Sequence, residues 1–216
     1  MIIEHRRSCQ AKKVFGGFSP RMNRKPRRSP RRAATSPIYQ LKITLVEIAP
    51  PVWRRILVRG DLSLERLHDV FQCVMGWQDA HLHEWTVGGR RYGQPEPDEP
   101  EYEVDEEAKL TLREAAPIEG ARFEYVYDLG DSWTHEVTVE KIELPDPELR
   151  AAECLIGERA CPPEDCGGPP GYEEFLEAIR DPRHPEHKDQ LAWVGGRFDP
   201  EAFDLAAVNR RLRLLK

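Results

Sequence analysis

The stretch RFEYVYDLGDSWTHEVTVEKIEL, residues 122–144, decides the fold class of this chain. Apolar and polar side chains alternate on both sides of the central DLGD, which is the pattern of two half-buried strands. The alternation places these residues on shared faces: Phe123, Tyr125 and Tyr127 on the first strand, and Trp133, His135, Val137 and Val139 on the second. Gly and Asp in DLGD supply the backbone conformations of a tight turn. The stretch therefore predicts an antiparallel hairpin.

More strands are predicted on the N-terminal side of this hairpin. IYQLKITLVEI (38–48) and RRILVRG (54–60) flank the turn APPVW and predict a second hairpin, while HLHEWTVGGRRYG (81–93) predicts a strand and a turn. A helix lies between them, with Asp61 or Ser63 as its N-cap and Gly76 at its end. The acidic stretch 94–107 is interpreted as a solvated loop or a lid over a site.

The C-terminal part of the chain is mainly helical in pattern. Tyr172, Phe175, Leu176 and Ile179 form one helical stripe, a short helix is expected over 185–193, and a third begins at an N-cap at Asp199. Strands precede helices rather than alternating with them. The sequence therefore predicts one α+β domain over 38–215, with a mostly antiparallel sheet of hairpins packed against about four helices.

Charge is distributed unevenly along the 216 residues. Residues 1–37 carry a formal charge of +10 and residues 38–216 carry −16, which gives the whole chain a net charge of −6. A segment so basic and so rich in Pro, Ser and Gly predicts disorder. It is either an arm that contacts nucleic-acid phosphates or an N-terminal stretch without function, with the true start at Met22. The candidate phosphate-contacting residues are Arg24, Lys25, Arg27, Arg28, Arg31 and Arg32.

The five cysteines and the hydropathy favour a cytoplasmic protein without a membrane partner. The cysteine count is odd, the first residues lack the apolar centre of a secretory signal, and no apolar run approaches the length of a membrane span. Reduced thiols are therefore expected rather than a disulfide framework.

Three histidines are candidate metal ligands. His81 and His83 alternate on one predicted strand, and His135 lies on an apolar face of the hairpin. If the strands are neighbours, the three rings converge as a set for a divalent metal such as zinc, with Asp128 or Asp131 completing it. The alternative is that each histidine is a hydrogen-bonded core residue.

The loop RACPPEDCGGPPGYEEF (159–175) also allows several interpretations. Cys161 and Cys166 have a wide version of zinc-ligand spacing, with Cys154, His184 or His187 as further ligands. The loop is otherwise a stiff structural corner, with prolines before the turn and Gly167–Gly168 within it. Reactive thiols are a third interpretation.

Four strings resemble one known family: GWQDAHLHEWTV, YVYDLGDSWTHEVTVE, ACPPEDCGGPPGYEEFLEAI and WVGGRFDPEAFDLAAVN. In this order they resemble the plasmid pRiA ORF-three-like family, also known as passenger TnpR-type proteins of insertion elements, over about residues 38–215. The resemblance implies a compact α+β domain associated with mobile elements, with no established activity, substrate or cofactor. Its polar signature falls on His81, His83, Asp128, Asp131, His135, Cys161, Glu164, Asp165 and Cys166.

Three functional hypotheses follow from the sequence. The first is a non-enzymatic accessory or binding domain for a peptide, small molecule or nucleic acid. Its pocket is formed by Trp85, Tyr127, Asp128, Asp131, Trp133, His135, Glu164 and Asp165. The second is a metal-dependent hydrolase-like enzyme built on the His/Asp cluster. The third is a nucleic-acid-associated factor that acts through the basic tail.

Overall fold

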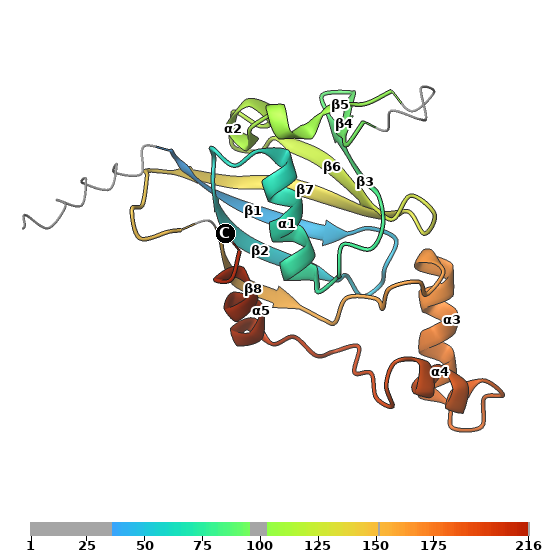
Figure 1. The fold of residues 1–216 in the computed structure, drawn as a ribbon. Coiled ribbons are helices and arrows are strands. Elements are labelled where there is room, and N and C mark those ends of the chain that lie inside the picture. Colours follow the sequence, from blue (N-terminus) through green and yellow to red (C-terminus); the bar gives the residue numbers. More distant parts are fainter. Residues whose placement is uncertain (1–35, 96–102, 151, 216) are drawn as a thin grey trace, which may run out of the picture. The chain divides into compact units, whose positions relative to one another are not determined.

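A computed structural model describes residues 36–95, 103–150 and 152–215 of the chain. Residues 1–35 of the predicted basic tail (1–37) lie outside this description. An eight-stranded sheet in the order β5-β4-β3-β6-β7-β1-β2-β8 forms the centre of the domain (Figure 1). Its strands are β1 (Ile38–Leu45), β2 (Trp53–Arg59), β3 (His83–Val87), β4 (Arg90–Gly93), β5 (Asp105–Glu106), β6 (Arg122–Tyr127), β7 (Trp133–Glu143) and β8 (Ala152–Glu158). Neighbouring strands are antiparallel, except for the parallel pair β4–β5. The predicted α+β class and the predicted hairpins are confirmed.

Helix α1 (Leu64–Met75) covers one face of the sheet (Figure 1). Ser63 is its N-cap and accepts a hydrogen bond from the Arg66 amide, and Gly76 ends it at φ +106°. The Phe71 ring meets the rings of Trp85 and Tyr125 edge-on, each at a centroid distance of 5.2 Å. Aromatic side chains of β3 and β6 therefore form the core beneath α1.

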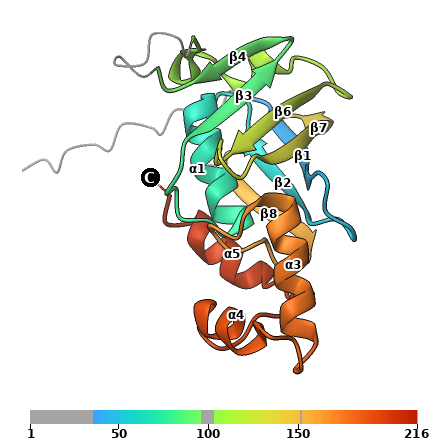
Figure 2. The same cartoon turned by 90° about the vertical axis from the view of Figure 1, so that its right-hand side faces the viewer.

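Three further helices, α3 (Gly168–Arg180), α4 (His187–Trp193) and α5 (Leu205–Leu212), lie near the edge of the sheet that β8 forms (Figure 2). The short helix α2 (Leu112–Ala115) and the 3-10 turn η1 (Glu107–Lys109) lie in the segment before β6. The predicted N-cap at Asp199 is wrong. Asp204 caps α5 instead by accepting from the Ala207 amide, whereas Asp199 accepts from Glu201 in a local turn. Both aspartates can bind nearby amides, and only the later one is followed by residues that pack on β8.

Strand β8 was not predicted. Only Cys154 of its seven residues is buried, so the strand shows no alternating pattern. It extends the sheet by pairing with β2, and the Asn209 side chain of α5 accepts from the Cys154 amide and donates to the Cys154 carbonyl. The edge of the sheet is thus partly occupied by a side chain.

The acidic stretch 94–107 differs from the expected solvated loop at its end. Glu107 is only 2% exposed, and residues 96–102 lie outside the description.

No helix in the described ranges has the length and apolar character required to cross a membrane.

Candidate functional site

Two loops that are far apart in sequence dock against each other at one end of the sheet. The tip of the β6–β7 hairpin contacts the glycine turn before α3, where the Gly167 amide donates to Asp131 Oδ2 at 3.0 Å. A Cβ atom on Gly168, which has φ +69°, would lie 2.6 Å from the Asp131 carbonyl oxygen. The cysteine loop is therefore a close-packed corner, as one of its three sequence interpretations stated.

The segment before β3 joins this corner from the other side. The Trp77 indole donates to the Pro162 carbonyl at 3.1 Å, and the Gln78 amide donates to Glu164 Oε1 at 2.8 Å. The Tyr127 hydroxyl accepts from the Ala80 amide and donates to Glu164. Three separate segments are thus fixed around the same point.

A group of four side chains, here called the rim cluster, lies where these segments meet: His81, Asp128, Glu164 and Asp165. His81 Nδ1 lies 3.6 Å from Asp128 Oδ2, and His81 Nε2 lies 3.0 Å from Asp165 Oδ1 and 3.9 Å from Glu164 Oε2. The contact with Asp165 lacks hydrogen-bond geometry, and among the described residues Nε2 has no hydrogen-bond partner although it is shielded from solvent. Ligand atoms of His81, Asp128 and Asp165 all lie within 4.8 Å of one another.

The rim cluster is rich in negative charge. Of the salt bridges found in the described part of the chain, none joins a Lys or Arg to Asp128, Glu164 or Asp165. Asp128 and Asp165 also have left-handed backbones, with φ of +56° and +57°. Asp128 Oδ1 accepts from the Gly130 and Asp131 amides, which leaves Oδ2 facing His81. Such backbones are uncommon for residues other than glycine and are enriched at functional sites.

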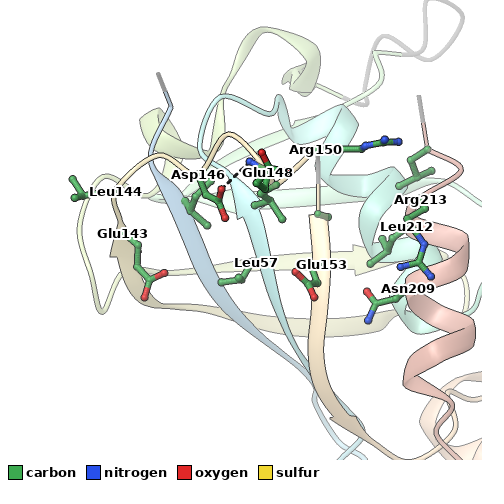
Figure 3. A pocket seen from close by; sticks show the side chains of 14 residues that line it. Leu57, Glu143, Leu144, Asp146, Glu148, Arg150, Glu153, Asn209, Leu212 and Arg213 are labelled. Carbon is green, nitrogen blue, oxygen red and sulfur yellow. Dashed lines mark hydrogen bonds between the residues drawn. The ribbon is translucent and has the colours of Figure 1, made fainter. Parts of the chain in front are cut away.

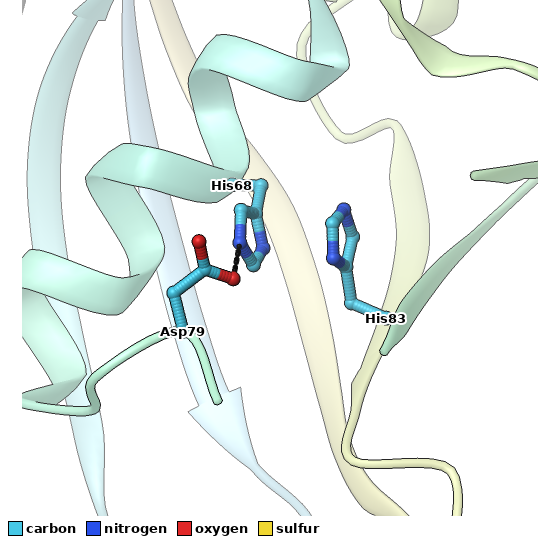
Figure 4. Close-up of side chains that lie close together, drawn as sticks. All are labelled: His68, Asp79 and His83. Carbon is cyan, nitrogen blue, oxygen red and sulfur yellow. Dashed lines mark hydrogen bonds and ion pairs between the residues drawn. The ribbon is translucent and has the colours of Figure 1, made fainter. Parts of the chain in front are cut away.

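A second group, here called the inner cluster, lies beneath α1 and comprises His68, Asp79, His83 and Glu107. His68 Nε2 lies 2.8 Å from Asp79 Oδ1, and His83 Nε2 lies 2.9 Å from Glu107 Oε2, which also accepts from the Trp85 indole. Figure 4 shows the rings of His68 and His83 facing each other, with Asp79 beside His68. Burial, followed by the neighbouring His83, lowers the pKa of His68, which favours the neutral ring.

The inner cluster is not arranged to hold one ion between its two rings. The ring centroids are 3.5 Å apart and the ring planes are inclined by only 8°. A metal ion binds an imidazole nitrogen in the plane of the ring, and no point between two parallel rings lies in both planes. The carboxylates instead bind one ring each, so this group fixes the Asp79–His83 segment.

Several predicted pocket residues belong to the core, which corrects the pocket expected from sequence. Trp85, Trp133 and His135 are each at most 1% exposed. His135 Nδ1 lies 3.1 Å from the Tyr125 carbonyl oxygen, and the Trp77 ring packs edge-on against the imidazole. Burial lowers the pKa of His135 to about 4. The predicted convergence of His81, His83 and His135 does not occur. His81 precedes β3 and faces the carboxylates of the rim cluster, whereas His83 and His135 lie on β3 and β7, which β6 separates, and the rings of His83 and His135 pack against Tyr125 at centroid distances of 5.9 and 5.3 Å.

The described cysteines belong to neither cluster, although Cys161 and Cys166 lie on the loop that carries Glu164 and Asp165. Cys73, Cys154, Cys161 and Cys166 are free thiols, and none belongs to a possible metal-binding group among the residues described. Burial raises the pKa of Cys154 to about 11 and that of Cys166 to about 12, and it also raises the pKa of Cys161. Protonated thiols are poor nucleophiles.

Three members of the inner cluster were missed by sequence reasoning. His68 lies on the apolar stripe of α1, one residue after Leu67, and this position is the one signal that marks it. Asp79 and Glu107 carry no such signal, because a turn and an acidic stretch are ordinary places for carboxylates.

A hollow of about 330 Å³ lined by Asp79–His83 and Gln94 adjoins both clusters.

Comparison with known proteins assigns the chain to a family. The sequence model of the plasmid pRiA4b ORF-3-like proteins matches residues 37–207. The chain belongs to this family. Among its relatives, the uncharacterized protein y4hQ of Sinorhizobium fredii is 36% identical over 175 residues, which cover 80% of this chain and 89% of y4hQ.

A solved structure extends the comparison to the fold of this plasmid pRiA4b ORF-3-like protein. The chain is similar to MM3350 of Methanosarcina mazei Go1, described as a protein of unknown function, with 35% identity and a TM-score of 0.70. The match covers 79% of this chain and 97% of MM3350. Neither relative's name states a ligand or a reaction.

Proposed function

We propose that this protein is an accessory binding domain of mobile-element origin and that its rim cluster binds a divalent cation. One observation carries the proposal: three carboxylates surround the imidazole of His81, and no lysine or arginine of the described salt bridges neutralises them. Like charges held this close favour a counter-cation. The plasmid in the family's name supports the mobile-element origin.

The donor set indicates the class of ion. One imidazole nitrogen with carboxylate oxygens suits zinc, manganese or ferrous iron, and none of the described cysteines belongs to this group. Asp165 has a side chain that is 71% exposed, so an ion here would be reached from solvent and would keep positions for water. The backbone bonds of Asp128 and Glu164 hold two of the ligands before an ion arrives.

Metal analysis and calorimetry with Zn²⁺ and Mn²⁺ test the proposal on the full chain. We expect about one ion per chain, and we expect His81→Ala and Asp128→Asn each to weaken binding at least tenfold. His184→Ala is the matched control, since His184 lies in the turn after α3, belongs to neither cluster and should leave affinity unchanged. Binding that survives both rim substitutions, or no binding of either ion, would refute the proposal.

A metal-dependent hydrolase is the second candidate, favoured by the solvent-facing position of the same cluster. A bound ion with open positions lowers the pKa of its water and supplies a nucleophile. Hydrolysis of p-nitrophenyl phosphate or acetate by the Zn²⁺- or Mn²⁺-loaded protein, lost in His81→Ala, would support this candidate. Stoichiometric metal binding without turnover of either compound would leave the binding domain as the better description.

A further inference from the structure

An exposed tryptophan stands between two hollows near the rim cluster. Trp193 ends α4 with 48% of its surface exposed and meets the Phe175 ring edge-on at a centroid distance of 5.8 Å. A hollow of about 480 Å³ on one side is lined by Trp77, Pro163, Phe198 and neighbouring residues. A hollow of about 400 Å³ on the other side is lined by carboxylates and Phe175. Both include Trp193, and together they are called the Trp193 groove.

The helix that carries Trp193 is poorly covered by the rest of the chain. None of the seven residues of α4 is buried, and its contacts are made mainly with α3. Large exposed aromatic side chains next to a groove are typical of binding surfaces, where Trp is among the residues that contribute most affinity. The described part of the chain thus leaves one face of α4 without a partner.

Carboxylates determine which partner fits this groove. Glu174, Glu186 and Asp189 line the smaller hollow together with Asp165. Among the described residues, Glu174, Glu186 and Asp189 form no salt bridge, and Lys188 forms none either. A guanidinium group stacks on an indole ring and binds carboxylates in pairs, so arginine matches both features of the groove. Nucleic acid is disfavoured here, because the same carboxylates repel phosphates.

We propose that the Trp193 groove binds an arginine-containing basic segment of a partner protein. Arginine guanidinium groups stack on Trp193 and pair with Glu186, Asp189 and Glu174, and the apolar stems lie along the exposed part of the indole. The larger hollow, lined by Trp77, Pro163 and Phe198, receives an apolar side chain of the same segment. This inference does not rest on the metal proposal, although Glu164 and Asp165 line the groove and also belong to the rim cluster.

Fluorescence anisotropy with labelled, end-capped hexa-arginine as probe tests the inference on the full chain. We expect Trp193→Ala to weaken binding about three- to tenfold, the range of one cation–π contact, and Glu186→Gln with Asp189→Asn to weaken it by a similar factor. A hexa-lysine probe should bind more weakly than hexa-arginine, because ammonium groups do not stack on the indole. All these side chains are exposed, so the variants should fold; thermal unfolding checks this point.

A matched control separates specific binding from attraction to the acidic body. Asp146→Asn with Glu148→Gln removes the same two charges beside a different hollow, shown in Figure 3, and should change affinity less than twofold. Equal weakening by both double variants, an unaffected Trp193→Ala, or no binding at all would overturn the inference. Binding of the probe in EDTA, and to His81→Ala, should be unchanged, so that failure of the metal site and failure of the groove are told apart.

Discussion

Gly168→Ala tests whether the docking of the two loops maintains the rim cluster. The substitution has two costs. Alanine at φ +69° has an unfavourable left-handed backbone, which costs about 1 kcal/mol. Its Cβ would also lie 2.6 Å from the Asp131 carbonyl oxygen, and relieving this overlap with backbone costs about 1–3 kcal/mol. We therefore expect the free energy of unfolding to fall by about 2–4 kcal/mol.

Gly120→Ala is the matched control for this experiment. Gly120 has φ +81°, and nothing lies within 4 Å of its Cβ position, so this variant bears the backbone cost of about 1 kcal/mol alone. Urea denaturation of the wild type and both variants measures the difference. Since Asp131 and Gly167 hold the hairpin tip on the loop that carries Glu164 and Asp165, Zn²⁺ affinity should also fall in Gly168→Ala and persist in Gly120→Ala. Equal destabilisation of the two variants would refute the overlap argument.

Further predictions concern a buried arginine, acid stability and the basic tail. Arg54, 2% exposed, donates to the carbonyls of Val74, Trp53, Glu158 and Arg159, so Arg54→Met should lower the free energy of unfolding by about 3–5 kcal/mol in urea denaturation. Arg55→Met, which breaks a part-exposed salt bridge with Glu140, should cost at most about 1 kcal/mol. The pKa of His135 is depressed to about 4, so the unfolded chain binds its proton first, and stability should fall by about 3 kcal/mol as pH drops from 6.5 to 4. His135→Leu should flatten that part of a pH titration of stability. Deletion of residues 1–37 should abolish salt-dependent DNA binding if the nucleic-acid hypothesis holds, and unchanged binding would end it.

The sequence predicts the individual strands and helices of this fold better than it predicts which of them pack against each other. Alternation and caps identify the hairpins and α1, because these signals are local. Strand β8 was not predicted because only Cys154 of this strand is buried in the core. The start of α5 was predicted wrongly because Asp199 and Asp204 can both accept from nearby amides, and only tertiary contacts determine which of them caps the helix. Both misses depend on packing between segments far apart in sequence.

The candidate site shows the same division between local and long-range information. Residue types marked His81, Asp128, Glu164 and Asp165 as polar candidates, but three separate segments supply them, and no local pattern gives their distances. Residue types also marked Trp85, Trp133 and His135, whose apolar faces turned out to be core. In this chain the candidates on apolar strand faces therefore belong to the core, whereas the carboxylates of the candidate site lie in or beside turns.

The positions of three aspartates explain how neighbouring histidines come to have different surroundings. Asp79, Asp128 and Asp165 all have φ near +56°, and each reaches an imidazole from a turn rather than from a strand. Asp79 is bonded to His68, whose stacked partner His83 is bonded to Glu107, so the carboxylates of the inner cluster are matched by ring nitrogens. Asp128 and Asp165 instead share His81 with Glu164, so carboxylates outnumber imidazoles in the rim cluster. This excess of negative charge, held by backbone bonds on a rigid corner, is the physical reason that a cation is expected at the rim cluster and not at the inner one.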